Sequence, residues 1–390
     1  MARPVARLTE LLPRVRLKDE IMMFIPEFAR SILAFVVVLG VLVFVHELGH
    51  YLAARWRGVH VEVFSIGFGR TITQWTDRHQ TVWKLSWIPL GGYVKLHGQE
   101  RAEDAAPEVR AGWMRGRTFH EKSVLSRAIV IAAGPIANFL LAVVLFAVLF
   151  GTVGRQVSTP VIGEILADSA ASRSGLQTGD RVQAIDGTPV ARFEDIQRMV
   201  SASPERPLRM QVLRDGQEQV LDVTPGVRES GGKQVGVLGV RNASSEVVRL
   251  GPVQAVAAGA VQTWDVTVQT LAGLGQMISK GENTDQIGGP LRIAQLSGQV
   301  AQLGIASLVG FIALLSVNLG LINLFPIPIL DGGHLVFLTI EGLRGKPLPP
   351  RAQEYGYRGG FALLITLFVF ATWNDLSHLQ VFRWFASLIG

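Results

Sequence analysis

Four long apolar segments stand out along the chain. They run over about Ser31–Ala54, Ala128–Val153, Ile305–Phe325 and Gly360–Leu376. A helix needs roughly 20 apolar residues to cross the roughly 30 Å hydrocarbon core of a bilayer. The pattern therefore predicts four transmembrane helices, of which the last is the shortest.

Between the first two apolar segments, Val61–Leu96 is rich in Gly, Trp and β-branched residues, and Thr81–Leu85 and Gly92–Leu96 have the pattern of strands. Aromatic side chains favour a sheet at the membrane interface or against the helices. A small exposed hairpin sheet is the alternative. The tryptophans that mark this surface are Trp56, Trp75, Trp83 and Trp87.

Residues 158–226 have the pattern of a compact α+β domain. Strands are expected at Val161–Leu166 and Arg181–Ile185, a helix at Phe193–Ser201, and a hairpin of Leu208–Leu213 with Gln219–Val223 around Asp215-Gly216. Farther on, apolar residues at three- and four-residue steps predict an amphipathic helix that either lies on the membrane surface or packs on the α+β domain. They are Val253, Ala257, Val261, Trp264, Val268 and Leu271.

Composition agrees with some membrane spans plus a sizeable soluble part, because 48% of residues are hydrophobic and the mean hydropathy is +0.32. Cysteine is absent, so no disulfide braces the chain and a zinc site would use histidine and carboxylate ligands. The net charge of +6 comes without a basic stripe interleaved with aromatics, which argues against nucleic-acid binding.

Basic residues are unevenly shared between the loops. Arg55–Arg127 holds 12 Lys/Arg in 73 residues, whereas Thr152–Ala301 holds 14 in 150. The positive-inside rule then places the first loop in the cytoplasm and the second outside. The basic arm of residues 1–30 would face outward, a conflict that favours a start at Met22 or Met23. No small-residue cleavage site follows the first apolar run, so a removable signal peptide is not predicted.

The first apolar segment ends in the pentapeptide His46-Glu47-Leu48-Gly49-His50. Residues i and i+4 share one helix face, so His46 and His50 can hold one metal ion. Glu47 is next to the first ligand, where it can reach water at the same ion. Such a pentapeptide also occurs by chance in soluble helices, but ionisable side chains inside a membrane usually serve function.

Near the end of the third segment stands a second motif, residues 323–334, which reads NLFPIPILDGGH. Two prolines, Pro326 and Pro328, preclude a regular helix there, so the backbone must unwind. Asp331 can then be the third metal ligand in an open zinc site of two histidines and one carboxylate. Alone, DGG is more typical of a turn with an Asx cap; beside the intramembrane HELGH, the ligand interpretation prevails.

Two further polar residues of this motif have candidate roles. Asn323 offers a donor and an acceptor, which suit a substrate backbone or an oxyanion. His334 is a weaker candidate, expected to support the site or the fold rather than to bind metal.

Together, HELGH in the first span, Gly134–Phe139 (GPIANF) in the second and NLFPIPILDGGH in the third resemble the site-2 protease family of intramembrane metalloproteases. The inserted domain, with Ser174–Gly187 (SGLQTGDRVQAIDG), resembles the PDZ domains of bacterial proteases. The resemblance extends from about residue 30 to the C-terminus. Family members close to this chain carry two tandem PDZ domains, whereas this chain has length for one.

The resemblance implies that His46, His50 and Asp331 bind zinc, that Glu47 is the catalytic base and that Asn323 contacts substrate. It implies a β-element at 61–96 that guides the substrate strand. It also implies a stress-response protease of the bacterial inner membrane that carries out regulated intramembrane proteolysis. Its substrates would be single-pass membrane proteins already shortened by another protease, such as an anti-sigma factor or a signal-peptide remnant.

The expected fold is thus a polytopic α-helical membrane protein with a β-hairpin element and an inserted PDZ domain, whose peptide groove is expected between Val161–Leu166 and Phe193–Ser201. Two other functions are open: a membrane adaptor with an inactive metal site, and a zinc transporter. The intact Glu47 argues against the first, and the lack of a ligand relay or internal repeat against the second. The expected parts are an arm (1–30), two spans (31–154) with a cytoplasmic loop (55–127), a PDZ domain (158–226), a periplasmic linker (227–304) and two spans (305–390).

Overall fold

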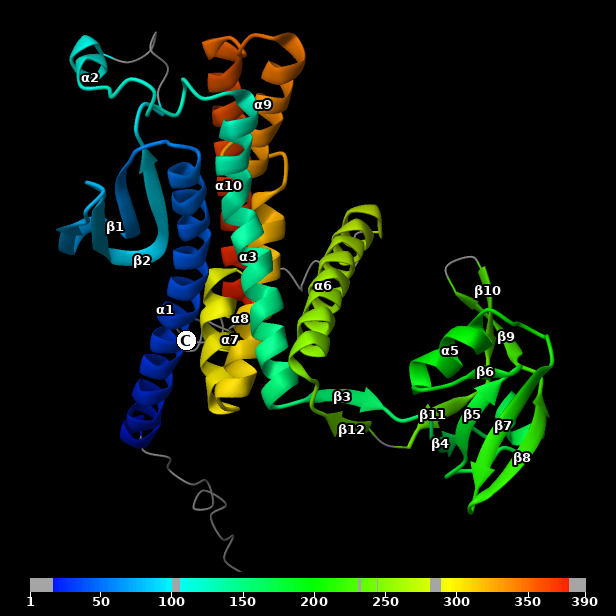
Figure 1. Cartoon of the computed structure of the whole chain (residues 1–390). Coiled ribbons are helices and arrows are strands. Elements are labelled where there is room, and N and C mark those ends of the chain that lie inside the picture. The colour runs from blue at the N-terminus through cyan, green and yellow to red at the C-terminus, as the bar shows by residue number, and fades with distance from the viewer. Residues whose placement is uncertain (1–16, 100–105, 231–232, 244, 281–288, 379–390) are drawn as a thin grey trace, which may run out of the picture. The chain divides into compact units, whose positions relative to one another are not determined.

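A computed structural model describes residues 17–99, 106–230, 233–243, 245–280 and 289–378 of the chain (Figure 1). These residues belong to two compact units. The helical unit comprises Met1–Ala147 and Val256–Gly390, and the inserted unit comprises Val148–Ala255. Each unit has its own hydrophobic core.

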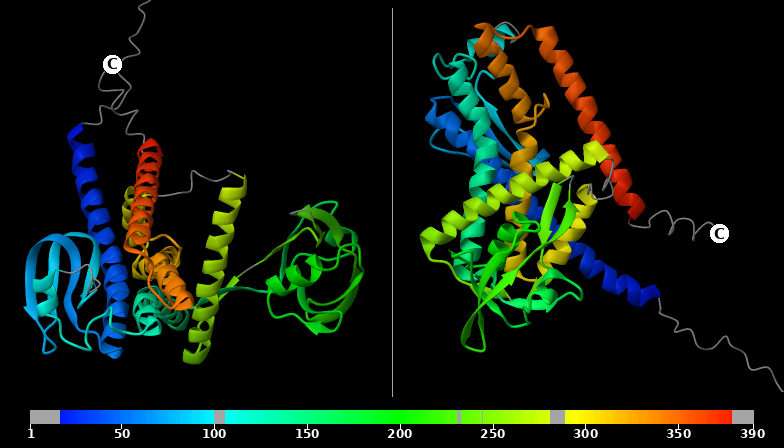
Figure 2. Two further views of the ribbon diagram at one scale, coloured as in Figure 1. Left: turned by 90° about the horizontal axis from the view of Figure 1, so that it is seen from above. Right: turned by 90° about the vertical axis from the view of Figure 1, so that its right-hand side faces the viewer.

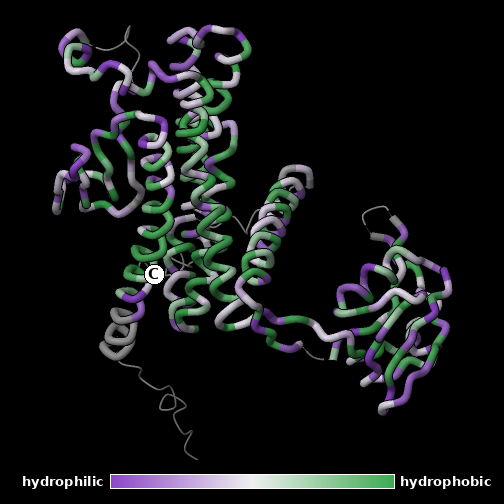
Figure 3. Tube along the Cα trace, viewed as in Figure 1, coloured by the Kyte–Doolittle hydropathy of each residue, from purple (hydrophilic) through white to green (hydrophobic). Residues whose placement is uncertain are grey.

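Four helices of the described chain are long and apolar enough to cross a membrane, which confirms the four predicted spans. They are α1 (Leu17–Trp56), α3 (Val124–Thr152), α8 (Ile305–Asn323) and α10 (Pro350–His378). Apolar residues dominate along α1, α3 and α8 (Figure 3). The protein is therefore a polytopic helical membrane protein. Because α1 begins at Leu17, residues 17–30 of the expected arm continue the first helix, and residues 1–16 lie outside the described chain.

The helices α1 and α8 share a buried apolar cluster of Val38, Leu42 and Ile312, and Leu141 and Leu145 of α3 pack against it. Ser316 of α8 donates a 2.8 Å hydrogen bond to the carbonyl of Asn138 in α3. Three segments far apart in the sequence are thereby held side by side.

Strands β1 (Val61–Thr76) and β2 (Val82–Leu96) form an antiparallel pair beside α1 (Figure 2). Both strands bend, so that the first half of β1 pairs with both halves of β2: Phe64 lies opposite Val94 and also opposite Trp83. The two strands thus make a sheet in the order 92–96, 61–66, 82–86, 71–76. Of the four tryptophans, Trp83 packs inward against Phe64, and the other three are exposed. A short helix, α2 (Pro107–Ala111), follows.

Asp77 closes the turn between these strands and ties it to α1. It accepts hydrogen bonds from Trp83 (3.1 Å) and from Tyr51 of α1 (3.2 Å), and from the backbone N–H groups of His79 and Thr81. Burial raises the pKa of Asp77, but these hydrogen bonds outweigh it and lower the pKa to about 2. The carboxylate stays charged and fixes the sheet against the first helix.

The linker contains two helices, α6 (Pro252–Lys280) and α7 (Pro290–Gln302). A Cβ on Gly259 of α6 would lie 2.6 Å from the Val143 carbonyl of α3, and Thr270 donates a 3.1 Å hydrogen bond to Asn318 of α8. From Val256 onward the predicted amphipathic helix therefore packs on these two spans. Such close approach through small residues is typical of helices packed in membranes.

Asp375 of α10 binds the start of α7. Its two carboxylate oxygens accept hydrogen bonds from the backbone N–H groups of Gly289 (2.8 Å) and Arg292 (3.0 Å). A carboxylate at a helix N-terminus satisfies free N–H donors and favours the helix dipole. The last helix is thereby joined to the linker.

The inserted unit has the predicted strands, helix and hairpin at nearly the expected positions. A four-stranded sheet has the order β6-β5-β7-β8, and α5 packs its buried Phe193, Ile196 and Val200 into the core. The elements are β3 (Arg155–Ser158), β4 (Ile162–Ile165), α4 (Ala170–Arg173), β5 (Arg181–Ile185), β6 (Thr188–Pro189), α5 (Phe193–Ser201), β7 (Leu208–Arg214), β8 (Gln217–Val223), β9 (Gly226–Ser230), β10 (Lys233–Val237), β11 (Val240–Asn242) and β12 (Ser245–Val248).

Two expectations for this unit need correction. The unit extends past residue 226, because β11 pairs with β4 and β12 pairs with β3. The expected peptide groove along β4 is also wrong, since both edges of β4 are occupied. On one side it pairs with β11, and on the other Ile162 exchanges backbone hydrogen bonds with Gly179 and Asp180. Among the described residues β11 pairs with β4 alone, so β11 is the edge strand.

Candidate metal centre

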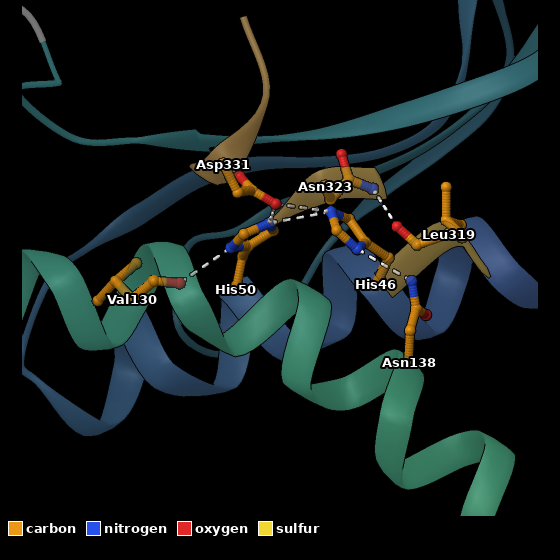
Figure 4. A network of polar contacts seen from close by, with 7 residues as sticks. All are labelled: His46, His50, Val130, Asn138, Leu319, Asn323 and Asp331. Atoms are coloured by element: carbon orange, nitrogen blue, oxygen red, sulfur yellow. Dashed lines mark hydrogen bonds and ion pairs between the residues drawn. The ribbon is translucent and has the colours of Figure 1, made fainter. Parts of the chain in front are cut away.

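Two turns of α1 present both histidines of the HELGH motif on one face, and both side chains are buried. The Nε2 atoms of His46 and His50 lie 3.2 Å apart. Helix α1 packs closely on α3 at this point: Gly49 has no Cβ, and a Cβ there would meet the Ala133 carbonyl. The helix thus supplies two imidazole nitrogens aimed at one point (Figure 4).

The third group comes from the start of α9 (Asp331–Arg344). Asp331 Oδ2 lies 3.2 Å from His46 Nε2 and 3.5 Å from His50 Nε2. The chain between α8 and α9 folds back tightly, and Cβ atoms on Gly332 and Gly333 would meet the carbonyls of Leu324 and Ile327. The two glycines therefore let the unwound segment bring Asp331 to the histidines.

The three donor atoms have the spacing that zinc requires. Zinc–ligand bonds of about 2.0–2.1 Å at tetrahedral angles put neighbouring ligand atoms about 3.3 Å apart. The observed separations are 3.2, 3.2 and 3.5 Å. Among the described residues, these three form a cluster whose His and Asp ligand atoms could hold one metal ion. Two imidazoles and one carboxylate fit a zinc ion with a fourth position for water.

Helix α3 lies behind both imidazole rings. The carbonyl of Val130 accepts a 2.9 Å hydrogen bond from Nδ1 of His50, which leaves its Nε2 free for a metal. A Cβ on Gly134 would meet His50 Nε2 and would lie 2.9 Å from His46 Cε1. One turn farther, the Asn138 amide is 3.2 Å from His46 Nδ1. Any side chain at position 134 would therefore displace the ligands.

Glu47 follows the first histidine of the motif and lies close to strand β2. It is within electrostatic reach of His46, His50 and Asp331. A Cβ on Gly92 of β2 would lie 3.1 Å from Glu47 Cγ and 2.8 Å from Val43, so a larger residue would push the strand away from α1. The edge of the sheet and the carboxylate of Glu47 are thereby adjacent.

Asn323 and His334 occupy different places. Asn323, which ends α8, donates from Nδ2 to the Leu319 carbonyl one turn earlier at 3.0 Å (Figure 4). His334 Nδ1 is 3.4 Å from the hydroxyl of Tyr357 in α10. His334 therefore lies outside the cluster of possible ligands in the described chain, and the role of Asn323 stays a prediction.

Helix α10 and the start of α3 support the segment that carries Asp331. A Cβ on Gly360 would lie 3.1 Å from Pro328, and one on Gly356 would lie 3.6 Å from the same proline. Arg127 of α3 makes a bidentate ion pair with Glu341 of α9 at 2.5 and 3.2 Å, and both side chains are largely buried. Two helices therefore hold the segment that carries Asp331.

The family model "Peptidase family M50" matches residues 34–367. The chain belongs to peptidase family M50. It is 46% identical over 367 residues to the "Putative zinc metalloprotease" of Rhizobium meliloti, covering 90% of this chain and 97% of the relative. A protein of the same name from Agrobacterium fabrum is 45% identical, covering 89% and 96%.

The "Regulator of sigma-E protease RseP" of Salmonella typhimurium is 34% identical over 450 aligned positions, covering 90% of this chain and 99% of the relative. The aligned length exceeds the 390 residues of this chain, so the Salmonella protein contains segments without a counterpart here. These relationships make this M50 peptidase a membrane-embedded zinc metalloprotease.

The sequence motifs predicted the three converging residues, and the roles of Glu47 and Asn323 stay predictions; the motifs gave no role to Gly134 or Asn138. Both were visible as interruptions of an apolar helix. A polar or glycine residue inside a span is a usable signal, yet its role depends on which helix it faces, and that follows only from the fold.

Proposed function

We propose that this M50 peptidase cuts within the transmembrane segments of single-pass membrane proteins. His46, His50 and Asp331 would hold the zinc, and Glu47 would act as the base. The observation that carries the proposal is the spacing of the three donor atoms, which matches tetrahedral zinc, at the end of a membrane span and beside a glutamate.

When bound, zinc supplies a Lewis acid that activates water and polarises the scissile carbonyl. The Glu47 carboxylate takes a proton from the attacking water and returns it to the leaving amide nitrogen. Asn323 is oriented by its bond to Leu319, so its Oδ1 can accept a hydrogen bond from a substrate N–H. Each residue thereby has one task.

A helical substrate must unwind before it can be cut, because its amides are closed off by internal hydrogen bonds. Addition of the unwound segment as a strand to a sheet edge would give those groups partners. The segment 92–96 is an edge of the β1–β2 sheet, and its Gly92 lies against Glu47. A strand added at this edge would reach the base directly.

The inserted unit would be a PDZ domain that selects substrates whose outer part has already been trimmed. A peptide that joins its sheet would add to β11, the edge strand, rather than to β4. Natural substrates would then include anti-sigma factors or signal-peptide remnants shortened by another protease.

The β3–β12 pair allows this selection to be tested cleanly. Ser158 and Ser245 are opposite one another, so residues 159–244 can be replaced by an Asn-Gly turn that closes the two strands as a hairpin. The shortened enzyme should cut a short model substrate at the normal rate and begin to cut untrimmed ones. A retained preference for trimmed substrates would show that the unit is only a spacer.

The proposed orientation has the 55–127 loop in the cytoplasm and the inserted unit in the periplasm, with the zinc site toward the cytoplasmic side. The chain contains no native cysteine, so Glu108→Cys and Asp215→Cys give clean single labels at exposed positions. A membrane-impermeant maleimide on intact spheroplasts should label the second and spare the first. The opposite pattern would invert the topology.

The function itself is tested with purified protein in liposomes that contain a single-pass model substrate. Mass spectrometry should find a cut inside the spanning segment that is lost with a zinc chelator and in the Glu47→Gln variant. Uptake of zinc into the liposomes without any cleavage would favour a transporter. Substrate binding without cleavage would favour an adaptor.

A further inference from the structure

One buried amide beside the metal group has no role in the mechanism above. Asn138 of α3 is fully buried, and its side chain faces His46 with Nδ2 at 3.2 Å from Nδ1. Its Oδ1 is buried without a hydrogen-bond partner in the described chain. A buried amide inside a membrane span is costly unless its groups are used.

The chemistry of His46 defines what it needs from this neighbour. Its Nε2 faces Asp331 and His50, so this nitrogen must carry the free electron pair that binds a metal. In a neutral imidazole the proton is then on Nδ1, which becomes a donor and requires an acceptor. The Asn138 amide provides one when Oδ1, rather than Nδ2, faces the ring, a half-turn of a group whose two ends are nearly alike in shape.

One face of α3 would then provide a hydrogen-bond acceptor for Nδ1 of each histidine. Positions 130, 134 and 138 follow one another at four-residue steps and lie on the same side of the helix. The Val130 carbonyl receives Nδ1 of His50, Gly134 leaves space for both rings, and Asn138 would receive Nδ1 of His46.

We propose that Asn138 is a positioning residue that fixes the tautomer and ring orientation of His46 by accepting its Nδ1–H, and that it thereby sets zinc affinity. The inference rests on the proposed ligand role of His46. Partners of this kind behind metal-binding histidines commonly change metal affinity about 10- to 100-fold.

The test measures zinc affinity by chelator competition on the full-length purified protein, with thermal stability in parallel. Asn138→Leu has similar volume without an acceptor and should bind zinc about 10- to 100-fold more weakly. Asn138→Asp restores an acceptor and should stay within about threefold of the wild type, as in carboxylate–histidine–zinc arrangements. A role in packing alone would not distinguish the two variants in this way.

Two controls separate the possible failures. Ser316→Ala removes the hydrogen bond to the Asn138 backbone at the same helix crossing and should leave zinc affinity unchanged even where stability falls. His46→Ala should lose zinc, and retention there would refute the proposed metal site itself. If His46→Ala loses zinc but Asn138→Leu binds it normally, or Asn138→Asp binds no better than Asn138→Leu, the positioning role is refuted alone.

Discussion

Each unit holds one carboxylate that illustrates a different use of charge, and the two have opposite surroundings. In the inserted unit, Asp180 is fully buried and accepts two 2.7 Å hydrogen bonds from Arg214 and one of 2.9 Å from the Gln177 backbone. In the helical unit, Asp331 faces two imidazole nitrogens at 3.2 and 3.5 Å, and no Arg or Lys is paired with it in the described chain. The first carboxylate has its partners built in; the second is arranged to share a cation.

The difference distinguishes a charge that stabilises the fold, Asp180, from a charge that is placed to bind a metal ion, Asp331. Burial raises the pKa of Asp180, but the hydrogen bonds from Arg214 and Gln177 outweigh it and lower the pKa, so the ion pair serves folding. Three ligand atoms that converge without a basic partner leave an uncompensated site unless a metal ion binds.

Gly134→Ala should abolish zinc binding although Gly134 is not a ligand. The Cβ of the new alanine would meet His50 Nε2 and lie 2.9 Å from His46 Cε1, so the two rings must move away from the positions in which they can share a metal ion. Zinc content measured by elemental analysis should fall to background. Gly40→Ala is the matched control on α1, where a Cβ meets nothing within 4 Å, and it should retain full zinc. Equal zinc in the two variants would show that α3 does not confine the site.

Asp180→Ala should destabilise the inserted unit and leave zinc content unchanged. Removing one partner of a buried ion pair typically costs about 3–5 kcal/mol, because the remaining charge is left unpaired. Limited proteolysis should cut residues 148–255 at a lower denaturant concentration than in the wild type. Loss of zinc in this variant would erase the distinction between the two carboxylates.

Arg127→Leu should weaken the support of Asp331 without removing a ligand. The bidentate pair with Glu341 holds α9 to α3, and charged hydrogen bonds of this type contribute about 1.5–3 kcal/mol. Thermal stability should fall and zinc affinity should decrease a few-fold. Arg358→Leu, which removes an exposed pair with Glu354 on α10, is the control and should change neither quantity.

Asp77→Asn should have the smallest effect, because Asp77 is a fully paired carboxylate like Asp180 but lies in the helical unit. Zinc should stay bound while cleavage slows modestly as the sheet loosens from α1. Its pKa is lowered to about 2, so its stabilisation is present above about pH 4 and disappears as the pH falls through about 2. The stability difference between wild type and variant should therefore vanish at low pH; a constant difference would contradict this account.

The strands and the helix of the inserted unit could be predicted, because the spacing of its hydrophobic residues shows which side chains are buried. Alternation along β7 and β8, the Asp215-Gly216 turn and the buried stripe of α5 all appear in the sequence. The pairing of β11 with β4 did not, because about 75 residues separate the two strands and short strands carry little pattern. The predicted position of the peptide groove along β4 was wrong because this pairing was not foreseen.

In the helical unit the metal-binding residues could be predicted, but the packing of the helices around them could not. Its spans follow from length and hydropathy, but α8 is apolar all round, so its sequence does not show which face meets α1 or α3. Chemistry identified HELGH and Asp331 as partners across 280 residues. The contributions of Gly134 and Asn138 required the helix crossing, since only their position behind the histidine rings gives them meaning.

In the proposed site, residues of α1 and α9 hold one zinc ion, with Glu47 as the base beside it. The most direct measurement compares zinc content and cleavage in two full-length variants, Asp331→Ala and Glu47→Gln. Asp331→Ala should lose both zinc and cleavage, whereas Glu47→Gln should keep about one zinc per chain and lose cleavage. Full zinc content in Asp331→Ala, or cleavage near the wild-type rate in Glu47→Gln, would contradict this assignment.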